Sequence, residues 1–597
     1  MSSEKEVLEF EEELAATRRD FLGFAIAGAA GLGLSLSSQD SLAENKSIKF
    51  QEGEAEAPNI TLEDLKGAEK VMGVSFNDEQ RKEVFDNLDG LRNSIKAIRN
   101  IKFKNSLPPA PAFEPRLPGK LYPDTTVKLI IENPSTSRKP YNDEDMAFAS
   151  LVDLGHWIKS KQITSLELTE IYLDRIEKYG ERLECFVTVT ADLARAQAKQ
   201  ADKDLAAGNY KGPLHGIPYS LKDLADTKGI KTTWGAEPFK NRIAESDATL
   251  VKTLREAGAV LLGKATSGAL AYGDVWFGGI TRNPWNLEEG SSGSSAGPSS
   301  STAAGLAAFG IGTETLGSII SPSNRCGLAG LRPSFGRVSR SGFMALSWSL
   351  DKVGPICRHV EDTAIVMSVI NKFDPGDASS SDIGFHYNGN ENLKDIRVGY
   401  VPEAFEGEDV SETDLKVLEA TKEMGLKLIV KKFPEIPINA MRPIIRAEAS
   451  AAFEEITTNG LIDTLKYYGN NRRGVQGRVT RFLSAIDYIN MERYRRIVME
   501  KMDAFFDDID VLISPNYAND LLTITNYTGT PQLIFRAGFM ETPSRTIFGR
   551  PVDENGPKHK VPIGFSVYGP LFGEGRMIRI AKVLEQKMGV VNERPKL

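Results

Sequence analysis

Residues 290–317 read GSSGSSAGPSSSTAAGLAAFGIGTETLG and are followed directly by Ser318. Nearly every residue from 290 to 304 is Gly, Ser, Ala or Thr. A solvated linker of this composition would continue polar, but from Thr302 the chain becomes apolar while its residues stay small. That change predicts a buried element, and we expect a helix packed closely against neighbouring backbone.

Such a stretch suits chemistry in which the backbone approaches a reacting group. Glycines let main-chain N–H groups converge on a developing negative charge, and serine hydroxyls serve as nucleophile or proton relay. A phosphate-binding loop would need Gly-Lys-Ser or Gly-Lys-Thr before a helix, and no lysine follows here. The stretch therefore favours acyl transfer over phosphate binding.

Three separated segments resemble the amidase signature family. Residues 312–319 read GTETLGSI, against the family's Gly-Thr-Asp-x-Gly-Gly-Ser-Ile. Residues 326–333 read CGLAGLRP, against Cys-Gly-x-x-Gly-Leu-Lys-Pro, and residues 216–223 read GIPYSLKD, against Gly-Ile-Pro-x-x-x-Lys-Asp. The three segments keep the family's order, and the resemblance extends over much of the region from about residue 146 to 588.

The resemblance implies a Ser-Ser-Lys catalytic triad. Ser318 takes the place of the nucleophile and Lys222 that of the base. The family keeps its bridging serine, which follows a cis peptide bond, 24 residues before the nucleophile; Ser294 stands at that spacing and Ser291 stands 27 residues before. We therefore expect Ser294 to be the bridge, with Ser291 as the alternative. Lys222 must be neutral to accept a proton, which burial away from acids would achieve by lowering its pKa.

The loop before the nucleophile is expected to form an oxyanion hole. Its backbone N–H donors would come from Thr315, Leu316, Gly317 and Ser318.

Three positions near the nucleophile depart from the family pattern. Leu316 stands where the family usually has Gly, which adds bulk beside the expected donors, and Ile320 stands where it usually has Arg, which removes a positive charge. Glu314 replaces the family's Asp and reaches further. Arg325 is one candidate for restoring the missing positive group.

The resemblance implies a cofactor-free amidase, a hydrolase of linear carboxamide C–N bonds that works through an acyl-enzyme on a small-molecule amide. One alternative is the glutaminase-like A-type chain of the glutamyl-tRNA(Gln) or aspartyl-tRNA(Asn) amidotransferase, a transferase that shares the signature and works in the cytoplasm. A non-catalytic binding protein on the same scaffold is a further alternative. Dimers are common in such enzymes, which leaves a homodimer open.

Composition excludes several other classes of function. The 597 residues carry a formal net charge of -8, which gives no electrostatic footprint for nucleic acid. The three cysteines have no metal-ligand spacing and the five histidines form no His-Glu-x-x-His pair, so no metal or cofactor is predicted. After the first forty residues no apolar run is long enough to span a bilayer.

The chain is expected to divide into three parts. Residues 1–43 resemble a twin-arginine export signal, with TRRDFL at 17–22, an apolar Gly/Ala-rich run and a cleavage site after Ala43. This predicts a periplasmic or otherwise exported protein, with a retained anchor or a cytoplasmic protein as alternatives. Residues 44–140 are expected to hold a polar spacer, a helical extension and a proline-rich linker, and 141–597 the catalytic domain.

Alternating strands and helices predict an α/β fold for the catalytic domain. A capping box at Thr164 and Glu167 opens a helix that we expect to end at Gly180. A strand at 186–190 and a helix at 191–207 follow, and another strand delivers Lys222. The resemblance implies a large mixed central sheet covered by helices on both faces, with the N-terminal helical extension outside it.

Overall fold

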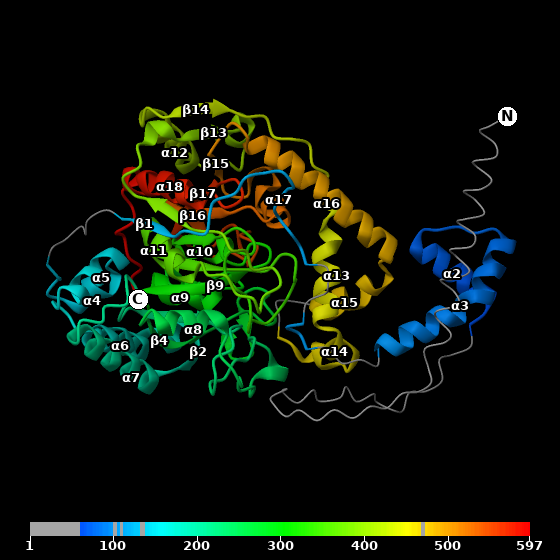
Figure 1. Cartoon of the computed structure of the whole chain (residues 1–597), viewed down its shortest axis with the longest axis horizontal. Coiled ribbons are helices and arrows are strands. Elements are labelled where there is room, and N and C mark those ends of the chain that lie inside the picture. Colours follow the sequence, from blue (N-terminus) through cyan, green and yellow to red (C-terminus); the bar gives the residue numbers. More distant parts are fainter. Residues whose placement is uncertain (1–59, 100–103, 108–111, 132–137, 467–471) are drawn as a thin grey trace, which may run out of the picture. The chain divides into compact units, whose positions relative to one another are not determined.

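An eleven-stranded mixed β-sheet forms the core of the part of the chain that the structure describes (Figure 1). The structure is a computed structural model, and it describes residues 60–99, 104–107, 112–131, 138–466 and 472–597. The predicted export signal at residues 1–43 lies outside these ranges and stays a prediction.

The order of the strands brings distant parts of the sequence together. From one edge to the other the sheet contains β14 (Lys427–Val430), β13 (Arg397–Tyr400), β15 (Val511–Pro515), β17 (Lys558–Tyr568), β16 (Gln532–Pro543), β10 (Ala329–Arg332), β11 (Lys352–Cys357), β9 (Phe309–Glu314), β3 (Pro218–Lys222), β4 (Val260–Ala265) and β2 (Phe186–Val189). Strand β3 pairs in parallel with β4 and β9, and β9 pairs antiparallel with β11. The end of β3, which carries Lys222, therefore lies inside the sheet with a neighbouring strand on each side.

Three short pairings of strands lie outside this sheet. They join β1 (Lys128–Ile130) to β12 (His386–Asn388), β5 (Val275–Trp276) to β6 (Gly279–Ile280), and β7 (Arg282–Asn283) to β8 (Asn286–Gly290).

Helices cover the sheet, as the α/β prediction required (Figure 1). They are α4 (Asp143–Phe148), α5 (Leu151–Lys159), α6 (Ser165–Leu183), α7 (Ala191–Ala206), α8 (Thr249–Glu256), α9 (Ala296–Ala303), α10 (Ile320–Cys326), α11 (Val360–Ile370), α12 (Glu412–Glu423), α13 (Arg442–Ala452), α14 (Glu454–Thr458), α15 (Arg472–Val479), α16 (Ala485–Phe506), α17 (Leu521–Thr528) and α18 (Glu574–Met588). Helices α9 and α10 pack against each other and against strands of the sheet, as do α11 and α18. The predicted architecture, a large mixed sheet with helices on both faces, is confirmed.

The N-terminal extension contains the two helices α2 (Leu62–Met72) and α3 (Asp78–Arg99). Thr61 begins α2 with a capping box, in which Asp64 N donates to Thr61 Oγ1 at 3.2 Å and Thr61 N donates to Asp64 Oδ2 at 2.8 Å. Arg81 of α3 donates back to Glu69 of α2 through Nε at 2.6 Å, which joins the two helices. Within the described ranges, no helix combines the length and the apolar character that a membrane span needs.

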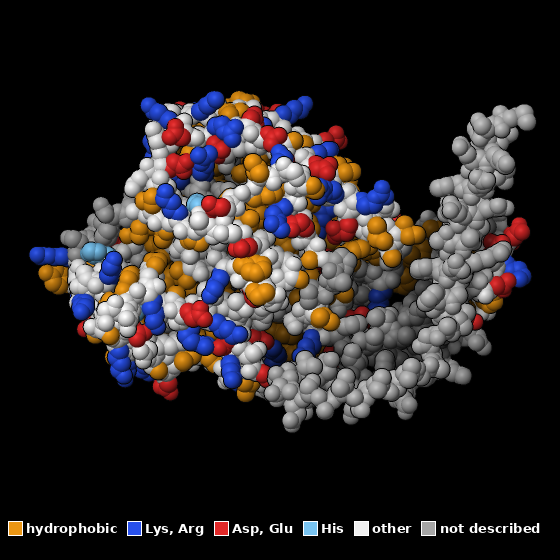
Figure 2. Space-filling view, viewed as in Figure 1, with side chains coloured by type: hydrophobic (Ala, Val, Ile, Leu, Met, Phe, Trp, Pro, Cys, Tyr) orange, Lys and Arg blue, Asp and Glu red, His pale blue; other side chains and the backbone are white. Residues whose placement is uncertain are grey.

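The face shown in Figure 2 mixes positive and negative side chains without a single basic area. Apolar side chains gather where α15 leads into α16, and the exposed members of this group are Val475, Val479, Phe482, Ile486 and Ile489.

The prediction of a buried helix beginning near Thr302 was wrong. The helix of this region, α9, ends at Ala303, and the following apolar residues form strand β9 at Phe309–Glu314. Gly305, with φ of 66°, turns the chain between them. A Cβ at Gly310 would lie 2.9 Å from Pro298 Cβ, so only glycine lets β9 approach α9 this closely. The small residues allow close packing, as expected, but they form a strand and not a helix.

The prediction that α6 ends at Gly180 was also wrong. The helix continues to Leu183 and ends at Glu184, which has a left-handed φ of 48°. Leu183 is fully buried, so one further helical turn adds an apolar side chain to the core. Gly180 is therefore an interior residue of the helix.

Replacing Gly180 with Ala should stabilise the protein by about 0.5–1 kcal/mol, because glycine in a helix interior loses more backbone entropy on folding. Its added Cβ would lie 3.4 Å from Ile176 Cγ2, an ordinary contact. Urea unfolding monitored by circular dichroism measures the change.

Gly208→Ala is the matched control, since Gly208 has open space around it but a φ of 84°. That substitution should destabilise the protein by about 1 kcal/mol through backbone strain. A loss of stability in Gly180→Ala would show that Gly180 ends the helix after all.

Candidate active site

Lys222 is a fully buried lysine at the end of β3. Its Nζ lies within hydrogen-bonding distance of three hydroxyl oxygens: Thr313 Oγ1 at 2.8 Å, Ser294 Oγ at 2.9 Å and Ser295 Oγ at 3.0 Å. It also lies 3.3 Å from Thr313 O. Residues about 70 and 90 positions away in sequence meet the amine because β9 and the start of α9 adjoin β3.

Burial lowers the pKa of Lys222 well below its ordinary value. The carboxyl groups of Asp351 and Glu314 act in the opposite direction but do not outweigh the burial. The prediction of a buried lysine holds, whereas the expectation that it lies away from acids was wrong. Lowering the pKa of a lysine favours its neutral form, which has a lone pair with which to accept a proton.

Ser294, and not Ser291, contacts the lysine. The peptide bond between Gly293 and Ser294 is cis, as the family resemblance implied. The Ser291 hydroxyl instead donates to Ser292 O at 2.9 Å and has no hydrogen bond to Lys222 in the described part of the chain. Of the two candidate bridging serines, the geometry therefore favours Ser294.

Ser295 is a polar member of this site that the sequence analysis did not single out. Its hydroxyl accepts from Thr313 N at 3.1 Å and donates to Thr313 O at 3.0 Å. Its backbone N donates to Ser318 O at 3.0 Å. Ser295 thus joins the lysine, the last part of β9 and the backbone of the expected nucleophile. The sequence feature that could have identified Ser295 is its position directly after Ser294.

Ser318 lies half-buried in the turn that follows β9. Across the ranges that the structure describes, no hydrogen bond joins its hydroxyl to that of Ser294, so the proton relay between the two serines stays a prediction. Catalytic hydrogen bonds are often long before a substrate binds.

The expected oxyanion donors lie in the loop between β9 and α10. Among the described residues, the backbone N–H groups of Thr315, Leu316, Gly317 and Ser318 have no hydrogen-bond acceptor. Side-chain contacts hold the loop: Thr315 Oγ1 donates to Asp351 Oδ1 at 2.5 Å. The Leu316 side chain is 36% exposed, so the bulk that replaces glycine points partly into solvent.

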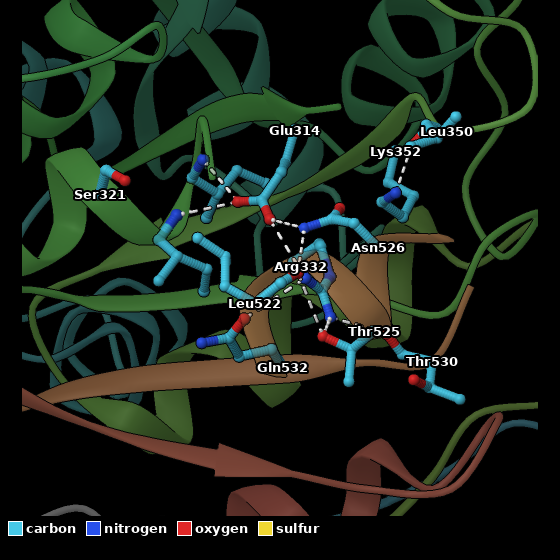
Figure 3. A network of polar contacts seen from close by, with 12 residues as sticks. Glu314, Ser321, Arg332, Leu350, Lys352, Leu522, Thr525, Asn526, Thr530 and Gln532 are labelled. Atoms are coloured by element: carbon cyan, nitrogen blue, oxygen red, sulfur yellow. Dashed lines mark hydrogen bonds and ion pairs between the residues drawn. The ribbon is translucent and has the colours of Figure 1, made fainter. Parts of the chain in front are cut away.

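Glu314 holds the start of α10 directly after the nucleophile (Figure 3). Its Oε2 accepts from the backbone N–H groups of Ile319 at 2.8 Å and Ile320 at 3.0 Å. Its Oε1 accepts from Asn526 Nδ2 at 2.8 Å and from Arg332 Nη1 at 3.2 Å. One carboxylate therefore ties the turn that carries Ser318 to β10 and to α17.

Arg332 places a positive charge beside Glu314, the carboxylate that binds the backbone directly after the nucleophile. Arg332 is fully buried, and it also donates to Thr530 O at 2.7 Å and to Thr525 Oγ1 at 2.9 Å (Figure 3). Arg325 pairs instead with Glu289 at 3.5 Å. The sequence-based suggestion that Arg325 restores the missing positive group stays a prediction.

The pKa of Glu314 reflects this network. Burial by itself would raise the pKa, but the Arg332 guanidinium, the Asn526 amide and the two backbone N–H groups lower it below the ordinary value. The carboxylate therefore stays charged at neutral pH and keeps its four hydrogen bonds.

His215 does not take part in the site, although it adjoins the Gly-Ile-Pro turn. Its ring is buried, with Nε2 2.9 Å from Ala201 O and Nδ1 accepting from Lys211 N at 3.2 Å. No group of three or more His, Cys, Asp or Glu side chains placed to hold a metal ion occurs in the described ranges.

Replacing Glu314 with Gln should destabilise the protein by about 3–5 kcal/mol, because it leaves the buried Arg332 charge unpaired. In urea unfolding, the double variant with Arg332→Met should lose clearly less than the sum of the two single variants.

The loss of stability in Glu314→Gln should also depend on pH. The folded-state pKa of Glu314 is lowered, so its stabilising contribution is present above the unfolded value of 4.5 and is lost as the pH falls through the lowered pKa. The stability gap between wild type and Glu314→Gln should narrow at acid pH. The network would be contradicted if the losses of unfolding free energy in the two single variants simply added in the double variant and if the difference between wild type and Glu314→Gln did not change with pH.

A family model and several known proteins resemble this chain. The family model described as Amidase matches residues 167–578. The A-type chain of the glutamyl-tRNA(Gln) amidotransferase from Carboxydothermus hydrogenoformans is 31% identical over 505 residues, which cover 76% of this chain and 100% of that protein. Its counterpart from Coxiella burnetii is 30% identical and covers 75% of this chain and 99% of that protein.

Solved structures share the fold. The peptide amidase from Stenotrophomonas maltophilia matches with a TM-score of 0.64 and 26% identity, covering 75% of this chain and 98% of that one. A bacterial aryl acylamidase of the amidase signature family matches with a TM-score of 0.62 over 75% of this chain and 99% of that one. At 22% identity, this second likeness concerns the fold alone.

Proposed function

Because this chain belongs to the amidase signature family, we propose that it cleaves the C–N bond of a small-molecule carboxamide through an acyl-enzyme on Ser318. The observation that carries the proposal is the buried Lys222 amine, 2.9 Å from the Ser294 hydroxyl. Next to it lies a loop whose backbone donors have no acceptor among the described residues.

The proposed reaction begins with a proton relay. Neutral Lys222 accepts the proton of the Ser294 hydroxyl while Ser294 accepts that of Ser318. Ser318 Oγ then forms a bond to the carbonyl carbon, and the carbonyl π electrons move onto oxygen. When the tetrahedral intermediate collapses, the C–N bond breaks and the amine leaves with the proton that the relay returns. Water attacks the resulting ester by the same route and releases the acid.

The backbone N–H groups of residues 315–318 support this chemistry by stabilising the oxyanion. Comparable donors contribute about 3–4 kcal/mol each to lowering the barrier where one has been removed. Glu314 keeps the turn after Ser318 in place through two backbone hydrogen bonds, at 2.8 and 3.0 Å, so the donors are oriented before substrate binds.

The protein can use this reaction either within a larger complex or by itself. The two amidotransferase chains named above match it at 30–31% identity over nearly their whole length, which favours an A-type amidotransferase chain that works in a complex. The twin-arginine-like segment at residues 17–22 instead favours an exported, stand-alone amidase. The purified chain should release ammonia or amine from a panel that includes glutamine, simple aliphatic amides and aryl amides.

The two roles give different results in that assay and in cell fractionation. An amidotransferase chain should be active on glutamine, remain in the cytoplasm and co-purify with partner proteins. An exported hydrolase should be active alone, and replacing Arg18 and Arg19 with Lys should retain it in the cytoplasm.

A fluorophosphonate that reacts with activated serines should modify Ser318, as mapped by peptide mass spectrometry. Ser294→Ala and Lys222→Ala should each reduce the labelling rate by a factor of about 10³ or more, because they remove the relay. Ser291→Ala is the matched control and should label like wild type. An equal loss of labelling rate in Ser291→Ala and Ser294→Ala would contradict the assignment of Ser294 as the bridging serine.

The labelling rate should also report the protonation of Lys222. Since burial lowers the pKa of Lys222 well below 10.5, the labelling rate should reach its plateau at a pH well below 10.5. It should fall as the pH drops through the lowered pKa, because protonated lysine cannot accept a proton. A rate that keeps rising until the pH nears 10.5 would indicate an ordinary lysine and contradict the mechanism.

A further inference from the structure

A cavity of about 70 Å³ adjoins the contacts of Lys222. Two threonines join it to the site: Thr313, whose hydroxyl lies 2.8 Å from Lys222 Nζ, and Thr315, the first expected oxyanion donor. Most of the remaining wall is apolar, and its larger side chains are Leu224, Phe343, Met344, Leu346, Trp348 and Val353. The cavity has room for a small organic group.

The charged residues that line the cavity already have partners. Arg340 pairs with Asp377 at 3.0 Å. Asp351 accepts from Thr315 Oγ1 at 2.5 Å, and burial raises its pKa. Lys352 donates to Leu350 O, and burial lowers its pKa well below the ordinary value. A charged ligand group would find no unpaired opposite charge in this wall, so the lining suits an uncharged, mainly apolar group.

The wall also offers a polar atom to a ligand. The indole Nε1 of Trp348 is buried, and no acceptor for it occurs in the described part of the chain. Its N–H could donate to one acceptor atom on an otherwise apolar group.

The N-terminal extension completes the wall. Ser106 is one of the lining residues, although it precedes the catalytic domain by more than thirty positions. Its neighbour Asn105 binds the backbone of Ala345 in both directions: Asn105 Nδ2 donates to Ala345 O at 2.8 Å, and Ala345 N donates to Asn105 Oδ1 at 2.6 Å. The same amide donates to Ala452 O at 3.2 Å, at the C-terminal end of α13.

A second contact anchors the extension beside the same wall. The ring of Phe113 lies 3.5 Å from the Arg495 guanidinium carbon and 5.0 Å from the Phe335 ring, edge to face. Arg495 in turn donates to Ser349 O at 2.8 Å, and Ser349 follows Trp348 directly. The extension therefore contacts both the segment that walls the cavity and the helices behind that segment.

We propose that this cavity receives the uncharged, mainly apolar part of the amide substrate, and that the turn at Asn105 and Ser106 forms its outer wall and limits the size of that part. The extension is thus a specificity-determining element of the active site. This inference rests on the proposed function, because it assigns a subsite to the same nucleophile.

Two fluorophosphonates that differ only in their alkyl group, ethyl and dodecyl, test the inference on the full chain. Ser106→Phe places a large side chain at the cavity wall and should lower the dodecyl rate relative to the ethyl rate by about tenfold or more. Lys104→Phe is the matched control, since Lys104 is exposed in the same turn and does not line the cavity, and its ratio should equal that of wild type.

Asn105→Ala removes the contacts to Ala345 and should shift the rate ratio the other way, toward the dodecyl probe, while circular dichroism confirms that the variants fold. If Ser318 is modified in every variant but the ratio of the dodecyl rate to the ethyl rate stays the same, the cavity assignment is overturned and the proposed function stays intact. Equal shifts in Ser106→Phe and Lys104→Phe would also overturn it. A wild-type chain that neither probe labels would overturn the proposed function, and this inference with it.

Discussion

The active site depends on a lysine amine held inside a β-sheet, away from water. Burying a charged ammonium group is costly, so the buried amine is driven towards its neutral form, which is the form that a general base needs. Lys222 is tolerated there because hydroxyls from Ser294, Ser295 and Thr313 surround its Nζ at 2.8–3.0 Å. The polar residues that make the burial possible also belong to the segments that carry the reacting serines.

A second buried group fixes the position of the nucleophile. The Glu314 carboxylate bonds to the backbone immediately after Ser318 on one side and to Arg332 and Asn526 on the other. A buried ion pair contributes little net stability compared with apolar packing, yet losing one partner is severe. Such a pair therefore fixes one geometry of the turn. The chain has Ile320 where the family usually has arginine, and Arg332 supplies the neighbouring positive charge.

The wall of the cavity is held from two directions. On the sheet side, Asp351 bonds to Thr315 of the nucleophile loop. On the other side, Asn105 of the extension and Arg495 of α16 bond to the backbone of the same wall. Among the described residues, parts of the chain outside the catalytic motifs thus hold the wall of the cavity without contacting Lys222 or Ser294.

The sequence by itself determined the α/β class, the positions of several helices and strands, and the set of motifs that singled out Lys222, Ser294 and Ser318, because these depend on local patterns and fixed spacings. It misplaced the end of α6 and took β9 for a helix, since small apolar residues suit either element until a neighbour is known. Only the tertiary structure showed the long-range contacts: acids near the lysine, Arg332 beside Glu314, and Asn105 bound to Ala345 of the cavity wall. The partners in these contacts are brought together by strand order and packing, which no local sequence pattern encodes.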